Sequence, residues 1–257
     1  MNTTLITGAS SGIGAAFARK LAKRGRNVLL VARSEEKLIA LCNEIGRVSG
    51  IRAQHVVMDL TEPDAAARLL EETQKRELLI DMLINNAGFG SMGDFTRLEL
   101  ETELEMIDLN VRSLVDLTYK FLLPMRERRQ GTIINVASTA AFQAVPFMAT
   151  YAATKAFVLS FSEALAEENA KHGIRVLALC PGVTDTNFFA ASKIDRPPMR
   201  TVQTAEEVVD AALRGLARGK STVISGWTNW VTVEAERFVP RSVVTKVAAK
   251  ALRSRFE

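Results

Sequence analysis

The sequence contains few of the residues that bind metals or form disulfides. Among its 257 residues are two cysteines, Cys42 and Cys180, and two histidines, His55 and His172. Two cysteines without metal-ligand spacing give neither a metal site nor a disulfide framework, which fits a reducing compartment. Both histidines lie outside every motif described below. We therefore expect no metal site and a cytoplasmic protein.

Long hydrophobic runs and dense clusters of positive charge are also absent. No window offers about 18 uncharged apolar residues for a membrane span, and no charged leader with an apolar run precedes the first strand pattern. The formal net charge is +4, but lysines and arginines do not cluster with aromatic residues as in nucleic-acid-binding proteins. We expect a soluble protein that binds neither a membrane nor a nucleic acid.

Short apolar segments alternate with helical patterns along the chain, without an internal repeat or a linker composition. Apolar strands separated by helices are typical of a parallel sheet with helices on both faces. The sequence therefore predicts an α/β fold, a single doubly wound Rossmann-type domain over residues 1–257 with about seven strands. The expected strands are Thr3–Thr7, Asn27–Ala32, Ala53–Met58, Asp81–Asn85, Thr132–Ala137, Arg175–Cys180 and a short one near Thr222–Ser225.

The first expected strand is followed by a glycine-rich turn and a helix. The turn reads TGASSGIG over residues 7–14. Glycines permit a tight turn and the close approach of backbone to a pyrophosphate, and the helix N-terminus offers unpaired N–H groups to phosphates. A glycine-rich turn can also be an ordinary loop without a ligand. Its place between the first strand and the first helix favours nucleotide binding. The expected cofactor-binding residues here are Gly8, Ser10, Ser11, Gly12, Ile13 and Gly14.

The end of the second expected strand indicates which dinucleotide is bound. An acidic residue at this place would hold the ribose 2′-hydroxyl of NAD, but the chain reads Ala32-Arg33-Ser34. A guanidinium without a neighbouring carboxylate favours a 2′-phosphate, so we expect NADP(H). The alternative is a solvated loop arginine paired with Glu35 or Glu36.

Polar residues also follow the third and fourth expected strands. Asp59 is suited to hold the adenine amino group, although an aspartate here is also a common helix cap. The stretch from Asn85 to Gly88 has the composition of a turn, but its place at the carboxyl end of a strand directs it toward the cofactor. We therefore add Asp59, Leu60, Asn86, Ala87 and Gly88 to the expected cofactor-binding residues.

Ser138, Tyr151 and Lys155 are the candidates for catalysis. Ser138 follows the fifth expected strand, and Tyr151 and Lys155 share one face of a helix expected from about Met148 to His172. A neighbouring ammonium favours the phenolate, so we expect it to lower the pKa of Tyr151 from about 10 toward neutrality. Taken alone, Tyr-x-x-x-Lys is more often a core tyrosine beside a lysine that snorkels to solvent.

Five segments together resemble the motifs of the short-chain dehydrogenase/reductase family. They are TGASSGIG (7–14), NNAG (85–88), Ser138, YAATK (151–155) and PGVTDT (181–186). Their joint occurrence is highly specific, whereas each motif alone is not. The resemblance implies a dinucleotide-binding fold and hydride transfer between a nicotinamide and a carbonyl or alcohol.

The resemblance also implies a role for each catalytic residue. Ser138 would bind the substrate carbonyl oxygen, and Tyr151 would donate or remove the proton. Lys155 would lower the phenol pKa and bond the nicotinamide ribose, and Asn110 would help to hold a water in the proton relay. An asparagine within a helix can instead mark a kink or be a satisfied core amide.

The PGVTDT segment matches the family's loop around the nicotinamide. The residues that correspond are Pro181, Gly182, Thr184 and Thr186. Thr184 stands where many members have valine or isoleucine, and because it keeps the β-branch and the backbone N–H we still expect the nicotinamide to be framed here.

Apolar residues near these motifs are candidate walls of a substrate pocket. They suit an apolar carbonyl compound, although the same residues also serve as core. Residues 187–203 contain two adjacent prolines and little periodicity, so a substrate lid is expected there. The candidate walls are Phe89, Phe142, Val145, Phe147, Met148, Phe188 and Phe189.

These features predict an NADPH-dependent carbonyl reductase for an apolar ketone or aldehyde, such as a β-ketoacyl, steroid-like or xenobiotic carbonyl. One alternative is an NADP-dependent alcohol or hydroxysteroid-type dehydrogenase that works oxidatively. Another is a non-catalytic NADP(H)-binding regulatory protein, against which the complete set of catalytic residues argues, because a binder has no use for a proton relay.

Two segments are expected to pack against protein, the first on a second chain and the second on the substrate lid or a partner subunit. By resemblance, the apolar-striped helices near Leu100–Leu123 and Met148–His172 pair across a two-fold axis, so a homodimer or homotetramer is expected. Residues 239–256 form an amphipathic pattern beyond the motifs, and this segment is expected to dock on protein rather than on an anionic membrane, because its stripe is poor in Trp and Leu. The stripe consists of Val243, Val244, Val247, Ala248, Ala251 and Leu252, opposite Lys246, Lys250 and Arg253.

Overall fold

A parallel sheet of seven strands forms the centre of the computed structural model, which describes residues 2–186 and 202–253. Its strands are β1 (Asn2–Thr7), β2 (Asn27–Ala32), β3 (Ala53–Val57), β4 (Leu79–Asn85), β5 (Gly131–Val136), β6 (Ile174–Cys180) and β9 (Thr222–Ile224). They lie in the order β3-β2-β1-β4-β5-β6-β9, and every neighbouring pair is parallel. The α/β fold expected from the sequence is therefore confirmed.

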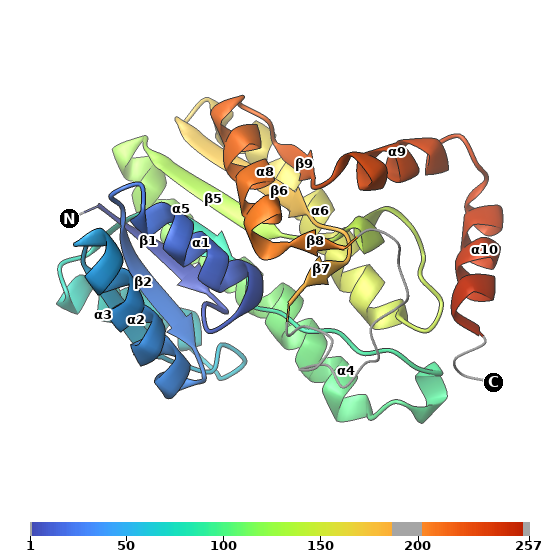
Figure 1. Ribbon diagram of the computed structural model, residues 1–257, viewed down its shortest axis with the longest axis horizontal. Coiled ribbons are helices and arrows are strands. Elements are labelled where there is room, and N and C mark those ends of the chain that lie inside the picture. Colours follow the sequence, from blue (N-terminus) through green and yellow to red (C-terminus); the bar gives the residue numbers. More distant parts are fainter. Residues whose placement is uncertain (1, 187–201, 254–257) are drawn as a thin grey trace.

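Helices cover both faces of this sheet (Figure 1). One layer consists of α1 (Gly12–Ala22), α2 (Glu35–Ser49) and α8 (Ala205–Ala217), and the other of α3 (Ala65–Lys75), α5 (Leu114–Arg128) and α6 (Ala149–Ala170). The side chains of adjacent strand residues pack against opposite layers, because successive side chains of a strand point to opposite faces of the sheet. Leu30 packs toward α1 and α2, whereas Leu29 packs toward α3 and α5, and both are fully buried.

The strand order reverses between β1 and β4, which places a crevice at the carboxyl ends of these strands. The chain moves from β1 to β2 and β3 on one side, and from β4 to β5 and β6 on the other. Open α/β sheets bind their ligands at such a switch point. The motifs that follow β1, β4 and β5 therefore meet at one edge of the sheet.

The helix expected near residues 100–123 is not continuous. A helix α4 (Leu100–Ile107) leads into a π-helix at Asp108–Ser113, and α5 begins at Leu114. Single turns of π-helix inside longer helices are frequent at functional sites, and Asn110 lies within this one. Because a π-helical turn contains more residues than an α-helical turn, the apolar stripe of α5 is rotated about the helix axis relative to that of α4.

Several short elements connect the helices and strands. Thr139–Phe142 and Phe95–Arg97 form 3₁₀ turns, and β7 (Thr184–Asp185) pairs with β8 (Gln203–Thr204) in a separate parallel ladder. Most of the expected lid, residues 187–201, lies outside the described residues, as do its two phenylalanines Phe188 and Phe189.

The last two helices leave the body of the molecule. Figure 1 shows α9 (Trp227–Glu236) running away from the sheet and α10 (Arg241–Arg253) crossing its far end at a steep angle. Among the residues that the structure describes, no helix combines the length and the apolar character that crossing a membrane requires.

Candidate active site

The glycine-rich turn forms the first side of the crevice. Gly8 and Gly12 have φ values of 62° and 54°, a left-handed conformation that other residues adopt only with strain. A Cβ atom on Gly14 would lie 2.5 Å from the carbonyl oxygen of Gly8, so a side chain there would force the turn open. The turn thus brings its backbone and the N-terminus of α1 to the crevice, where an anion is favoured.

Thr7 and Asn86 hold this turn against the end of β4. Thr7 Oγ1 accepts hydrogen bonds from the backbone N–H groups of Asn86 and Ala87, both at 3.0 Å. The side-chain amide of Asn86 donates to the carbonyl oxygens of Thr7 and Gly8, at 2.9 and 3.1 Å. Asn86 therefore shapes the glycine-rich turn through its side chain, a role that its place after β4 did not reveal.

Ser138 and Tyr151 meet across the crevice. Ser138 follows β5 and caps the 3₁₀ turn, where its hydroxyl accepts from the N–H of Ala140 at 3.1 Å. Tyr151 lies in the first turn of α6, and its phenol is hydrogen-bonded to the Ser138 side chain. The serine hydroxyl and the phenol therefore lie at one point, as the sequence predicted.

Lys155 is buried one turn further along α6. Its Nζ donates to the carbonyl oxygen of Val136 at 2.9 Å and lies 5.8 Å from the centroid of the Tyr151 ring. Burial lowers the pKa of Lys155 from 10.5 to about 8, because removing an ammonium from water disfavours its charged form. The alternative of a lysine that snorkels to solvent is excluded.

The expected effect of Lys155 on the phenol is not found. Burial raises the pKa of Tyr151 above its ordinary value of 10, and the hydrogen bond to Ser138 only partly opposes this. The prediction of a lowered phenol pKa is therefore wrong for this structure. Its physical reason is that desolvation of the phenolate outweighs the attraction expected from the helical spacing of the two residues.

Asn110 ties three elements together beneath the site. Its Nδ2 donates to the Phe89 carbonyl oxygen at 2.9 Å and to Thr154 Oγ1 on α6 at 3.1 Å, and its Oδ1 accepts from the N–H of Phe89 at 3.2 Å. A Cβ atom on Gly88 would lie 2.7 Å from Asn110 Oδ1, so the glycine is needed for this approach. These three hydrogen bonds use both the oxygen and the nitrogen of the buried Asn110 amide. Its part in a water relay stays a prediction.

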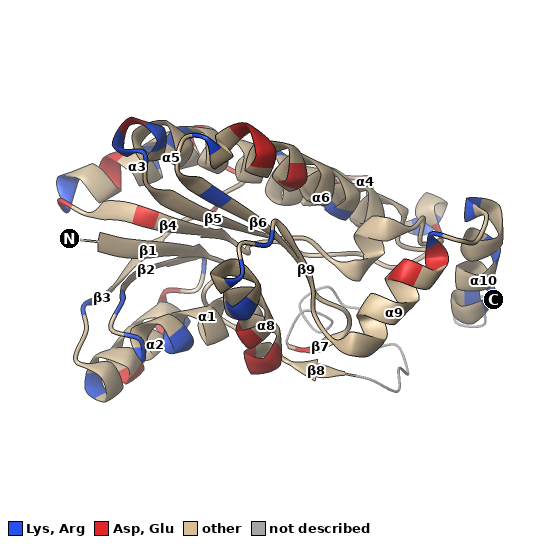
Figure 2. Ribbon diagram, turned by 90° about the horizontal axis from the view of Figure 1, so that it is seen from above, with Lys and Arg blue, Asp and Glu red and all other residues tan. Residues whose placement is uncertain are grey.

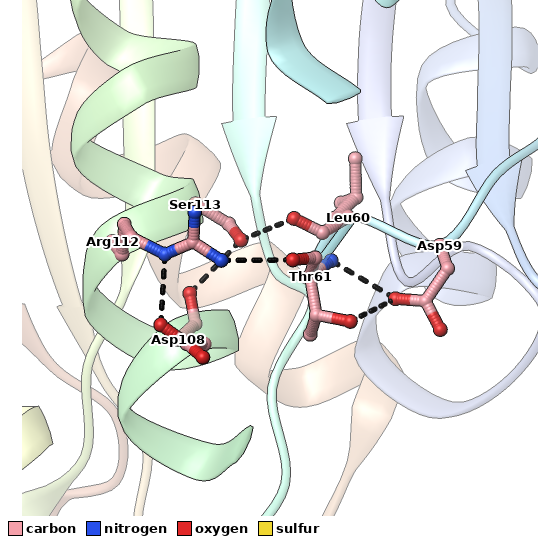
Figure 3. A network of polar contacts seen from close by, with 6 residues as sticks. All are labelled: Asp59, Leu60, Thr61, Asp108, Arg112 and Ser113. Carbon is pink, nitrogen blue, oxygen red and sulfur yellow. Dashed lines mark hydrogen bonds and ion pairs between the residues drawn. The ribbon is translucent and has the colours of Figure 1, made fainter. Parts of the chain in front are cut away.

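A polar network fixes the π-helix to the loop after β3 (Figure 3). Arg112 binds Asp108 Oδ1 at 2.7 Å and donates to the Thr61 carbonyl oxygen at 2.8 Å. Ser113 Oγ donates to the carbonyl oxygen of Leu60. The adenine side of the expected cofactor site is thereby connected to the segment that carries Asn110.

Asp59 and Arg33 lie together at the far end of the crevice. Asp59 Oδ1 accepts from the N–H and the hydroxyl of Thr61 at 2.9 and 2.7 Å, the pattern of a local cap. Arg33 Nη1 lies 3.5 Å from Asp59 Oδ2 and 3.5 Å from Glu105 Oε1. The arginine therefore pairs with these carboxylates and not, in the described structure, with Glu35 or Glu36. Burial raises the pKa of Asp59, but the Thr61 hydrogen bonds and Arg33 outweigh this and lower it overall.

The loop after β6 closes the crevice on the catalytic side. The Pro181 carbonyl oxygen accepts from the N–H of Thr139 at 2.9 Å, and Thr184 Oγ1 donates to the Gly182 carbonyl oxygen at 3.0 Å. A Cβ atom on Gly12 would lie 3.1 Å from the Thr186 side chain, so this loop reaches the glycine-rich turn. The motif predicted to bind the pyrophosphate and the motif predicted to frame the nicotinamide are therefore in contact.

Most of the predicted site residues line a single cavity of about 390 Å³. A larger groove of about 880 Å³ beside α8 and β9 contains none of them. From the predicted set, the cavity is lined by Gly8, Ser11, Gly12, Ile13, Asn86, Ala87, Gly88, Ser138, Tyr151, Lys155, Pro181, Gly182, Thr184 and Thr186. Ser10, Gly14, Arg33, Asp59, Leu60 and Asn110 lie outside its lining.

The substrate walls were predicted only in part. Phe89, Val145 and Met148 line the cavity, whereas Phe142 lines the larger groove and Phe147 lines neither. The lining also includes residues that were not predicted as walls, namely Met92, Val136, Ala137, Thr139, Ala140, Gln143, Val183, Asn229 and Leu252. No local sequence pattern identifies Asn229 on α9 or Leu252 on α10 as cavity residues. They reach the cavity only because of the course that the C-terminal helices take.

Known proteins have similar sequences and the same fold. The model of the family described as short chain dehydrogenase matches residues 2–197. Hydroxysteroid dehydrogenase-like protein 1 of Gallus gallus is 36% identical over 221 residues, 85% of this chain and 66% of that protein. The very-long-chain 3-oxoacyl-CoA reductase of Rattus norvegicus is 31% identical over 262 residues, 98% of this chain and 81% of that protein.

A solved structure agrees with these relatives. The short-chain dehydrogenase from Sphingobium yanoikuyae in complex with NADPH is 34% identical, with a TM-score of 0.83 over 92% of this chain and 94% of that one. Its fold, the family model and the cavity with Ser138, Tyr151 and Lys155 lead to the same conclusion. The chain belongs to the short-chain dehydrogenase/reductase family, whose members are oxidoreductases that interconvert alcohol and carbonyl groups.

Proposed function

We propose that the protein is an NADPH-dependent reductase of apolar ketones or aldehydes, with Tyr151 as the general acid. The observation that carries this proposal is the cavity that joins Ser138, Tyr151 and Lys155 to the glycine-rich turn. Nucleotide and carbonyl would thus meet at a phenol that is hydrogen-bonded to a serine hydroxyl.

The residues present fit a dinucleotide. Gly8 and Gly12 line the cavity and carry no side chain that would fill it, so the backbone of the turn is accessible to a close ligand. The N-terminus of α1 would bind the pyrophosphate, Arg33 a 2′-phosphate, and the loop from Pro181 to Thr186 the nicotinamide. When bound, a reduced nicotinamide supplies the hydride.

The side chains of Ser138, Tyr151 and Lys155 are suited to supply the proton that a carbonyl reduction needs. Ser138 can donate a hydrogen bond to the carbonyl oxygen and stabilise the negative charge that develops there. Because burial raises the pKa of Tyr151, its phenol stays protonated at neutral pH and is ready to donate. Lys155, with a pKa of about 8, is a cation close to the same point. Reduction therefore has its acid in the correct protonation state.

The walls of the cavity favour an apolar substrate. Phe89, Met92, Val145 and Met148 contribute apolar surface close to Ser138. Such walls bind hydrocarbon through burial of surface rather than by specific hydrogen bonds. The names of two relatives, hydroxysteroid dehydrogenase-like protein 1 and very-long-chain 3-oxoacyl-CoA reductase, refer to largely apolar compounds.

A panel of ketones and aldehydes with NADPH tests the proposal. We expect NADPH consumption with bulky apolar carbonyls and little with small polar ones. Preferential oxidation of the matching alcohols by NADP at neutral pH would support the oxidative alternative. Tight NADPH binding without turnover of any carbonyl or alcohol would instead indicate a regulatory binder.

Replacement of Arg33 tests the cofactor preference. Arg33→Ala should reduce the preference for NADPH over NADH by about 1.5 to 3 kcal/mol, since a charge-assisted contact to the 2′-phosphate is lost. Dissociation constants for both cofactors, measured by fluorescence titration, check this. Arg47→Ala, at an exposed arginine on α2, is the matched control. Equal affinities of the unmodified protein for the two cofactors would contradict the prediction.

Association of copies is a second expectation. Tyr119 and Leu123 on α5 and Phe157 on α6 are exposed, and apolar surface of this kind is normally covered by a partner. We propose a homodimer or homotetramer that uses this face. Light scattering at micromolar concentration should give at least twice the mass of the 28.2 kDa chain, and a monomer would refute it.

A further inference from the structure

The apolar stripe expected on the C-terminal helix is only half covered. Val244, Ala248 and Leu252 are partly buried on the inner side of α10, and Leu252 lines the catalytic cavity. Val243 and Val247 face outward, with 46% and 64% of their surface exposed, and no described residue of α10 is buried. The helix therefore presents a second, uncovered apolar row.

Positive charge borders this uncovered row. Lys246 and Lys250 follow Val243 and Val247 by three residues each, which places them beside the valines on the helix surface. Figure 2 shows basic positions and no acidic position on α10. Neither lysine has an ion pair within the described residues. A partner for this face should be apolar in its middle and acidic at its border.

The helix α4 has this complementary pattern. Leu100, Leu104 and Ile107 form an outward row with 59%, 52% and 42% of their surface exposed. Three acidic residues lie along one side of this row, namely Glu101, Glu105 and Asp108. Glu105 and Asp108 already pair with Arg33 and Arg112, whereas Glu101 is exposed and has no ion pair in the described part of the chain.

We propose that α10 of one copy packs on α4 of a second copy. The valine row would lie against the leucine row, and Lys246 and Lys250 would face the acidic border. In a two-fold dimer the contact occurs twice, because each copy supplies one α10 and one α4. An anionic lipid surface would also attract the lysines, but it would leave the leucine row of α4 uncovered and would be repelled by its acidic border.

This inference goes beyond the proposed activity, since it connects assembly to the cavity. Leu252 lies on the inner side of the same helix that the partner would hold, and α4 continues into the π-helix with Asn110. Docking would therefore fix two elements of each active site from outside. Its loss should weaken the binding of bulky substrates more than that of small ones, because only the former need the wall at Leu252.

Cross-linking between separately labelled chains tests the contact. One preparation carries Leu104→Cys and another Val247→Cys, both at exposed positions. After mixing and mild oxidation, a disulfide-linked species of twice the chain mass should form in the mixture and not in either preparation alone. Val48→Cys, at an exposed position on α2, replaces Leu104→Cys in the control mixture. A yield no higher than in this control, with all variants folded, would overturn the proposal, as would a cross-link that forms only when both cysteines are in one chain.

Charge reversal provides the second measurement. Lys246→Glu with Lys250→Glu should reduce the cross-link yield and raise KM for a bulky ketone at least several-fold, with little effect on KM for a small aldehyde. Adding Glu101→Lys should partly restore the cross-link yield and partly lower KM for the bulky ketone again. Equal changes for the two substrates without rescue would contradict the proposal. So would binding of the unmodified protein to vesicles of phosphatidylserine and phosphatidylcholine that the lysine variants lose, with no cross-link in any mixture.

Discussion

Tyr151→Phe should lower kcat for carbonyl reduction by at least about 100-fold while leaving the dissociation constant for NADPH nearly unchanged. The change removes one hydroxyl and keeps the ring that lines the cavity. The oxygen it removes is the one hydrogen-bonded to Ser138. Because that proton is needed only when the carbonyl is reduced, the loss should appear in kcat and in kcat/KM alike.

The chain provides a matched control for this experiment. Its only other tyrosine, Tyr119, is exposed on α5, so Tyr119→Phe should retain full turnover. Stopped-flow or steady-state loss of NADPH absorbance measures kcat, and fluorescence titration measures cofactor binding. Turnover of the Tyr151 variant at the original rate would show that another group donates the proton.

The strands were predictable because each is a short apolar run with a clear boundary. The limits of β2 agree residue for residue, and β1, β3, β4, β5, β6 and β9 differ by one or two residues at their ends. Strands buried on both faces must be apolar throughout, so they stand out between amphipathic helices. The place of each motif at a strand end then followed from the parallel topology.

The missed features depend on contacts between distant segments. The π-helix at Asp108–Ser113 is held by Thr61 and Leu60, about fifty residues away in the chain, and no local pattern predicts it. Leu252 joins the cavity through the course of α9 and α10. The uncovered row of α10 was hidden in the same way, because a helical wheel shows which residues share a face but not how far the molecule covers that face.

The pKa of Tyr151 illustrates a second limit. Sequence spacing identifies Lys155 as a neighbour, but the sign of the shift depends on how much water the phenol loses. Here desolvation dominates and raises it. The same physics acts on Lys155 with opposite sign, since its charged form is the protonated one. Burial therefore keeps the Tyr151 phenol protonated and makes the Lys155 ammonium easier to deprotonate.

Lys155→Met should abolish most of the activity and should remove a pH dependence of stability. The buried ammonium has a pKa of about 8 in the folded protein against 10.5 ordinarily. Below pH 8 the lysine is protonated in both states, and its burial costs about 3 kcal/mol of folding free energy. Between pH 8 and 10.5 the unfolded chain binds more protons than the folded one, so stability rises with pH and the cost disappears.

Denaturation in urea at a series of pH values measures this difference. The free energy of unfolding of the unmodified protein, minus that of Lys155→Met, should rise by about 3 kcal/mol from pH 8 to pH 10.5. The subtraction removes the titration of groups common to both proteins. The variant also loses the bond to the Val136 carbonyl oxygen, which shifts the difference by a constant of about 1 to 3 kcal/mol but not its slope. Lys37→Met, at an exposed lysine on α2, is the matched control for loss of an ammonium. A flat difference for Lys155→Met would mean that the ammonium is solvated in the folded protein, and a falling one would mean that a buried anion stabilises it.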